Sequence, residues 1–326
     1  NTLSFIYTII AGHENSDLEY NSSTAFSLNN SVIQDLAGNN VSLTLPTVGE
    51  TGSLATNKDI VIDGVFAMVD SVSAITANGY FKAGDTLNIT VHFDENVNVT
   101  AIPQLALETG SNDATIYYTS GSGTSILTFQ YIADEGHLNT DLGYVNTLSL
   151  SLNNGLIRDI AGNNATLTLA EPGASGSLSG NRALVVDAVS PSVVSVSSSE
   201  LNGMYNIGDT LEITVNFSEV VAANISNGLP QITLETGSAD AVINYAVGSG
   251  TNTLVFNYTV AKGDTATNLD YKSTSSLVLN NGSIKDVAGN SASLTLASPS
   301  STNSLGANKA LVIDTGAPIV SSVTST

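Results

Sequence analysis

Acidic and amide side chains recur at equivalent positions along this chain, in a pattern that could bind metal ions. Aspartate closes three aliphatic runs, glutamate follows two alternating runs, and Asp and Asn bracket the phrase Asp-x-Ala-Gly-Asn. Carboxylate and amide oxygens are the ligands that Ca²⁺ prefers, roughly six to eight per ion. We therefore expect metal ligands among Asp63, Glu95, Asp159, Asn163, Asp187, Glu219, Asp286, Asn290 and Asp314.

The elements that position these residues belong to a tandem repeat. The aspartate of Asp-x-Ala-Gly-Asn falls at Asp35, Asp159 and Asp286, at intervals of 124 and 127 residues. Such a period exceeds the roughly 20 to 50 residues of a solenoid repeat and approaches the size of a β-sandwich domain. We expect a C-terminal half repeat at 1–63, whole repeats at 64–187 and 188–314, and the first strand of another at 315–326.

Period-two alternation predicts strands. Apolar residues alternate with polar ones over 87–93 and 211–217, and Gly-Asp precedes each run. Further strands are expected at 104–109, 114–118, 127–131, 192–198, 231–236, 241–245, 254–258 and 319–323. No convincing amphipathic helix is present, and the linkers between repeats are short. The pattern predicts an all-β fold of tandem Greek-key immunoglobulin-like β-sandwiches.

That topology would bring acidic residues together where two repeats meet. The glutamate would lie in the loop after its strand, beside the Asp-x-Ala-Gly-Asn loop and the closing aspartate of the preceding repeat. The first set is Asp63, Glu95, Asp159 and Asn163, and the second is Asp187, Glu219, Asp286 and Asn290. A bound Ca²⁺ would then cross-link adjacent repeats and stiffen the joint.

Each acidic position also has a purely structural interpretation. In Asp-x-Ala-Gly-Asn, the aspartate can accept hydrogen bonds from backbone amides and form a turn. The closing aspartates can end strands and solvate a hinge, and the two glutamates can be exposed turn residues. Both interpretations stay open on the sequence.

Composition narrows the classes of function. The 326 residues carry 29 acidic and 8 basic side chains, a formal net charge of −21, and no cysteine. Nucleic acid and anionic membranes are poor partners for such a polyanion, and no apolar run approaches the roughly 20 residues of a membrane span. The chain has no Gly-x-Ser-x-Gly or P-loop phrase, and the histidine shared by His13 and His137 is replaced by Asp264. We expect no enzyme and no membrane insertion.

Several phrases in order resemble a known class of module. They include Gly208-Asp209-Thr210, Leu234-Glu235-Thr236-Gly237, Gly248-Ser249-Gly250-Thr251 and Leu311-Val312-Ile313-Asp314. They resemble bacterial immunoglobulin-like, cadherin-like tandem repeats of large surface proteins and adhesins, including repeats of a cyanobacterial motility-associated cell-surface protein. The resemblance implies an extracellular, non-catalytic array at the cell surface, often stiffened by calcium in related modules. The ligand phrases of cadherins themselves are absent.

The expected function is a structural or adhesive array that calcium rigidifies at its joints, acting as a stalk or filament segment. One alternative is an adhesin module that recognises glycans or another surface through variable loops such as 98–102 and 222–229. Another is a self-assembling filament or sheath subunit that uses strand complementation, because 1–63 is half a repeat. The expected partners are neighbouring repeats or subunits of the same protein, and surface glycans or other cells.

Overall fold

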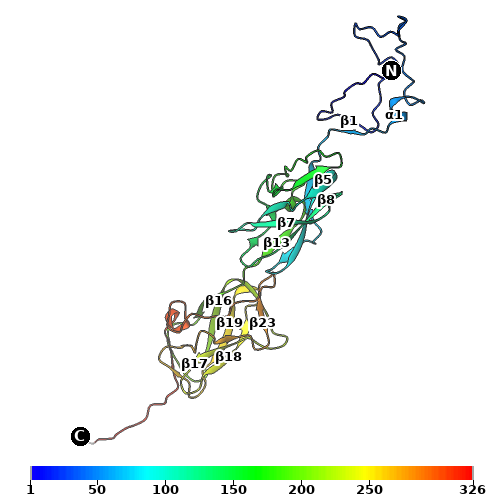
Figure 1. Cartoon of the computed structure of the whole chain (residues 1–326). Coiled ribbons are helices and arrows are strands. Elements are labelled where there is room, and N and C mark those ends of the chain that lie inside the picture. Colours follow the sequence, from blue (N-terminus) through cyan, green and yellow to red (C-terminus); the bar gives the residue numbers. More distant parts are fainter. Residues whose placement is uncertain (1, 325–326) are drawn as a thin grey trace.

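The computed structural model describes residues 2–324 and is built almost entirely of β-strands. Two β-units lie end to end, and the chain termini lie at opposite ends of an elongated molecule (Figure 1). The prediction of an all-β fold made of sandwiches is confirmed.

The first complete unit holds two sheets. An antiparallel sheet has the order β10-β6-β7-β8-β5-β12, with β11 on β6 and β3 on β5, and a three-stranded sheet has the order β4-β13-β9. The run β6-β7-β8-β5 places the first strand beside the fourth, as in a Greek key. The strands are β3 Val69–Ala74, β4 Gly79–Phe81, β5 Thr86–Thr100, β6 Gln104–Glu108, β7 Ala114–Ser120, β8 Thr124–Ile132, β9 Leu138–Asn139, β10 Gly143–Tyr144, β11 Leu150–Ser151, β12 Leu156–Asp159 and β13 Leu184–Asp187.

The second complete unit repeats this arrangement. Its large sheet has the order β14-β16-β19-β18-β17-β21, with β22 on β17 and β23 on β16, and its small sheet is β15-β24-β20. The strands are β14 Val193–Ser198, β15 Gly203–Tyr205, β16 Thr210–Asn224, β17 Gln231–Glu235, β18 Ala241–Val247, β19 Thr251–Thr259, β20 Thr265–Ala266, β21 Asp270–Tyr271, β22 Leu277–Val278, β23 Ser283–Lys285 and β24 Leu311–Asp314.

Each unit has a hydrophobic core of its own. In the first, residues of the large sheet such as Leu105 and Leu127 pack with Val186 of the small sheet. The second core is a separate cluster of buried residues between 196 and 313. The alternation predicted for β5 and β16 is confirmed, because Leu87 and Leu211 are fully buried at the start of these strands. Period-two patterning therefore orients the strands correctly.

The two glutamates expected in loops lie inside strands instead. Glu95 belongs to the 15-residue strand β5 and Glu219 to the 15-residue strand β16. In each case the pairing with the next strand shifts register around the glutamate, between His92 and Val97 and between Asn216 and Val221. The expectation that each strand ends in a loop before its glutamate was wrong. A bulge interrupts the hydrogen-bond pairing at this point, but the backbone stays extended on both sides of the bulge.

Three single-turn helices were not expected from the sequence. They are α1 Leu54–Asn57, α2 Leu178–Asn181 and α3 Leu305–Asn308, and each begins after a serine whose hydroxyl accepts a backbone N–H of the turn. One turn is too short to show helical periodicity. In the complete units, Asn181 Nδ2 donates to the carbonyl of Val72 and Asn308 Nδ2 to that of Val196, both at 2.8 Å. None of the helices formed by residues 2–324 has the length or apolar character of a membrane span.

Residues 2–63 contain only two short strands, β1 Glu14–Asn15 and β2 Ile62–Asp63, besides α1. The segment equivalent to β8 forms no strand, and Phe5 is 78% exposed whereas the equivalent Phe129 is fully buried. Strand β8 is bonded to β5 on one side and β7 on the other, and residues 2–63 offer no counterpart of these two strands. The strand expected at 319–323 is also absent. Asn1 and residues 325–326, at the outer ends of the predicted segments, lie outside the described residues.

Candidate metal centres at the joints between units

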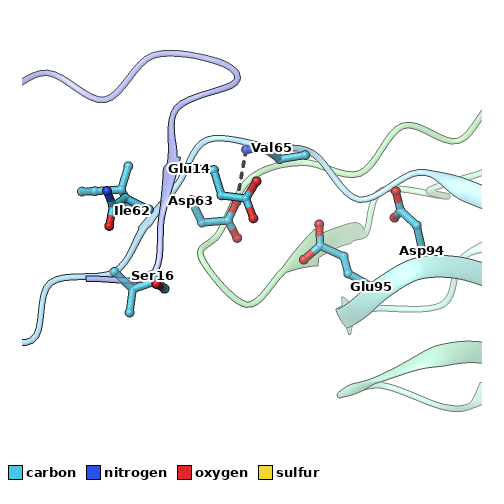
Figure 2. Close-up of a pocket in the computed structure, with 9 residues that line it drawn as sticks. Glu14, Ser16, Ile62, Asp63, Val65, Asp94 and Glu95 are labelled. Carbon is cyan, nitrogen blue, oxygen red and sulfur yellow. Dashed lines mark hydrogen bonds between the residues drawn. The ribbon is translucent and has the colours of Figure 1, made fainter. Parts of the chain in front are cut away.

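Three carboxylates converge where residues 2–63 meet the first complete unit. Asp63 ends β2, Glu95 lies at the bulge of β5, and Asp159 ends β12. One oxygen from each lies within 4.8 Å of the others. Figure 2 shows Asp63 and Glu95 approaching this joint from different segments of the chain. Asp63 and Glu95 line part of an open cleft of about 380 Å³.

The second joint repeats the arrangement with equivalent residues. Asp187 ends β13, Glu219 lies at the bulge of β16, and Asp286 follows β23. Their carboxylate oxygens again lie within 4.8 Å of one another. The structure thus brings together six of the seven carboxylates expected to bind metal, in two sets of three.

The closing aspartate of each unit is oriented by the linker that follows it. Asp63 Oδ1 accepts the backbone N–H of Val65 at 3.1 Å, and Asp187 Oδ1 accepts that of Val189 at 3.3 Å. An aspartate that binds the amide two residues onward forms an Asx-turn. In both joints this turn leaves the second carboxylate oxygen, Oδ2, without a bond to the linker.

In the Asp-x-Ala-Gly-Asn loop, both carboxylate oxygens of the aspartate accept hydrogen bonds from the loop itself. Asp286 Oδ1 accepts the N–H groups of Gly289 and Asn290 at 2.7 and 2.9 Å, and its Oδ2 accepts Asn290 Nδ2 at 2.8 Å. The equivalent bonds of Asp159 have the same pattern. Gly289 has a φ of 94°, a left-handed conformation that glycine adopts without strain. The turn-forming role of the loop is therefore present in the structure.

The asparagines, expected as ligands, use their amide nitrogens to hold the joint. Asn290 Nδ2 donates to the carbonyl oxygen of Asp187 at 2.7 Å, and Asn163 Nδ2 donates to that of Asp63 at 3.1 Å. Each asparagine thus ties its own unit to the last strand of the preceding unit. The bond fixes the loop and its aspartate against the closing aspartate.

Burial and neighbouring negative charges raise the pKa of two acids at the second joint, Glu219 and Asp187. Burial raises the pKa of Glu219, and the charges of Asp187 and Asp286 raise it further. Burial likewise raises the pKa of Asp187, and the charge of Asp286 adds to the effect although the Val189 N–H opposes it. Like charges held close together in a partly desolvated site disfavour the ionised state.

The first joint is more acidic than the sequence comparison predicted. Burial raises the pKa of Glu95, as do the charges of Asp159, Asp63, Asp94 and Glu14, in that order. Glu14 lies opposite Asp63 in the β1–β2 pair and points into the cleft (Figure 2). Repeat comparison missed Glu14 because Leu138 and Thr265 pair with the closing aspartates of the other units. Repeat comparison also missed Asp94, although its position directly before Glu95 was a visible signal.

Asp94 has a second role at its joint. Its Oδ1 accepts the N–H of Met68 at 2.8 Å, and in the next unit Ser218 Oγ accepts the N–H of Ser192 at 3.0 Å. The residue before each glutamate therefore anchors the incoming chain whether or not it carries a charge.

Asp314, the remaining expected ligand, stands apart from both sets. It ends β24, and its Oδ1 accepts the N–H of Gly316 at 2.9 Å, as in the other closing turns. Among residues 2–324 it belongs to no group of three acids that could share an ion. Asp35 in the N-terminal segment keeps the same loop bonds with Asn39.

No family model matches the chain, and no curated protein matches it. What the geometry offers chemically is a set of three carboxylates at each joint, contributed by three separated segments. An oxygen-only donor set suits hard cations such as Ca²⁺ or Mg²⁺, and the flexible coordination of Ca²⁺ accommodates added carbonyls and water best.

Proposed function

We propose that this chain is a non-enzymatic structural segment of an extracellular, cell-surface array, and that Ca²⁺ binds at its joints and makes the array stiff. The observation that carries the proposal is the repetition of the acidic triad. Asp63, Glu95 and Asp159 at one joint have the same origins in the fold as Asp187, Glu219 and Asp286 at the next. A catalytic centre is ordinarily single, whereas a device that spaces units has to recur at every joint.

Electrostatics supports the role of the ion. In the metal-free joint the carboxylates repel one another, which favours opening of the hinge. Neither of the two ion pairs among residues 2–324 involves a member of the triads. A divalent cation would turn this repulsion into attraction and link three segments at one point.

Short linkers and hydrogen bonds across each joint also restrict how two adjacent units can be oriented. The linkers are short, and Asn163 and Asn290 each bond across a joint to the preceding unit. A bound ion would add to this restraint, so the array would project as a rod. The surface location and the stalk or adhesive role rest on the resemblance to bacterial surface repeats together with the acidic, cysteine-free composition.

Small-angle X-ray scattering with and without calcium tests the proposal. We expect the maximum particle dimension and the thermal midpoint to rise when CaCl₂ is added to EDTA-treated protein. Isothermal titration should show two binding events, one for each joint. Identical scattering and midpoints in EDTA and in millimolar calcium would show that the joints work without the ion.

A matched pair of variants separates site binding from general charge effects. The double variant Glu95→Gln, Glu219→Gln removes one carboxylate from each triad, and we expect it to lose the calcium response. The control Glu171→Gln removes an exposed carboxylate outside both triads and should keep the response of the wild type.

Self-assembly by strand complementation is a second candidate function, favoured by the apolar face of residues 2–63. Leu3, Phe5, Tyr20, Phe26 and Leu54 line an open hollow of about 630 Å³, and exposed apolar faces of this kind promote association. Concentration-dependent sedimentation that Phe5→Ser abolishes would support this function. A monomer at all concentrations would oppose it.

A further inference from the structure

The first complete unit carries a groove with polar and apolar walls whose lining includes no member of either triad. Its volume is about 400 Å³, and it is lined in part by Asp113 before β7 and by Val145 and Leu148 between β10 and β11. Val145 is 36% exposed and Leu148 is 75% exposed. Aliphatic side chains that line a groove together with a carboxylate suit an extended cationic side chain, whose stem is apolar and whose head is charged.

The second complete unit shows how the same place is filled from within. Lys272 occupies the position of Val145, because its N–H donates to Thr233 as the N–H of Val145 donates to Ala106. Asp240 occupies the position of Asp113. Lys272 Nζ donates to Asp240 Oδ2 at 2.5 Å and forms an ion pair across the surface.

In the first unit the carboxylate is left without such a cation. Within residues 2–324 Asp113 takes part in no ion pair, and its Oδ1 accepts only the N–H of Thr109 at 3.4 Å. The first unit has the shorter Val145 where the second has Lys272. The path that a lysine stem would follow is therefore open in the first unit. At the position of Ser275 this unit has Leu148, which adds apolar surface beside that path.

We propose that this groove binds a lysine or arginine side chain of a partner polypeptide. The aliphatic stem lies along Val145 and Leu148, and the cationic head pairs with Asp113, as Lys272 does with Asp240. The excess of 29 acidic over 8 basic residues attracts basic partners to the chain. The groove gives that attraction a specific position on the first complete unit, whereas Lys272 pairs with the equivalent carboxylate in the second. It therefore adds a binding function to the structural role.

Nuclear magnetic resonance titration of the whole chain tests the inference. The probe is Nα-acetyl-lysine N-methylamide, and the comparison is the norleucine analogue, which has an aliphatic side chain of similar length without the charge. We expect saturable shifts at Asp113, Val145 and Leu148 with the lysine probe and at least tenfold weaker binding of the norleucine analogue. Asp113→Asn should weaken lysine binding at least tenfold, and Val145→Lys should abolish it by filling the groove.

A gain-of-function variant makes the test independent of damage to the groove. Lys272→Val combined with Ser275→Leu copies the open groove into the second complete unit, beside Asp240. We expect a second set of saturable shifts there, with unchanged spectra elsewhere as the control for folding. Equal binding by wild type and Asp113→Asn, or no new site in the double variant, would overturn the inference.

Discussion

The side-chain amide of Asn290 lies 2.7 Å from the carbonyl oxygen of Asp187, which is 103 residues earlier in the chain. Asn290 is 6% exposed, and the same amide group also holds Asp286. One residue therefore connects a unit, its candidate metal ligand and the last strand of the preceding unit.

Replacing Asn290 should loosen the joint and destabilise the unit. Asn290→Ala removes the side-chain amide that donates to the Asp187 carbonyl and to Asp286 Oδ2, and we expect a loss of about 1–3 kcal/mol of unfolding free energy. Urea unfolding followed by circular dichroism measures this loss. Asn39→Ala is the control. The side-chain amide of Asn39 donates to Asp35 in an exposed loop, and this bond does not cross a joint. An unchanged transition in Asn290→Ala would show that the bond across the joint contributes nothing.

Neutralising the bulge glutamates should have opposite effects with and without calcium. The folded-state pKa values of Glu95 and Glu219 lie above the ordinary 4.5, so the folded state binds these protons more tightly than the unfolded state. Their destabilising effect therefore appears as pH rises through the folded pKa and vanishes below the ordinary value. In EDTA at pH 7, Glu95→Gln with Glu219→Gln should raise the thermal midpoint.

The advantage of that double variant should disappear as the pH falls from 7 toward about 4, because the wild-type glutamates are then protonated as well. In calcium at pH 7 the sign should reverse, since the variant lacks a ligand at each joint. Differential scanning calorimetry under the three conditions measures both effects. A variant that is less stable than wild type in EDTA at pH 7 would contradict the raised pKa values.

Substitution of the loop glycine should be costly because of its backbone. Gly289 has a φ of 94°, and an added Cβ there would be strained whatever the space around it. We expect Gly289→Ala to cost more than about 1 kcal/mol. Gly203→Ala is the matched control, because Gly203 does not have this conformation and no atom lies within 4 Å of an added Cβ. Equal stabilities of the two variants in urea would rule out the conformational explanation.

A core substitution should unfold one unit without the other. Phe256 is fully buried in the second complete unit, so Phe256→Ala should lower the stability of that unit by about 3–5 kcal/mol. The first complete unit has a separate core and should keep its transition apart from a small nearest-neighbour effect. Phe129→Ala provides the reciprocal control. Simultaneous loss of both units in hydrogen exchange would mean that the array unfolds as one.

Much of the fold and part of the candidate site could be predicted from local sequence pattern. The alternation around Leu87 and Leu211 predicted buried strands because successive side chains point to opposite faces of a sheet. The repeat interval predicted equivalent units. Comparing repeats also selected the carboxylates of both triads, since an equivalent position in one fold has an equivalent location in space.

The single-turn helices and the continuity of β5 and β16 could not be predicted in this way. A helix such as Leu178–Asn181 is shorter than one period of the pattern that would reveal it. A bulge keeps extended backbone on both sides of an irregular point, so Glu95 has the sequence context of a strand end without being one.

The amino-acid sequence by itself determined which residues face the core, how often the unit repeats and which acids recur. Only the tertiary structure decided that Asn290 reaches Asp187, that Glu14 joins the first cleft, and that Asp113 lacks the cation that Asp240 has. The physical reason is range. Side-chain alternation and turns depend on neighbouring residues, whereas these contacts join segments tens to a hundred residues apart and exist only once whole units have packed.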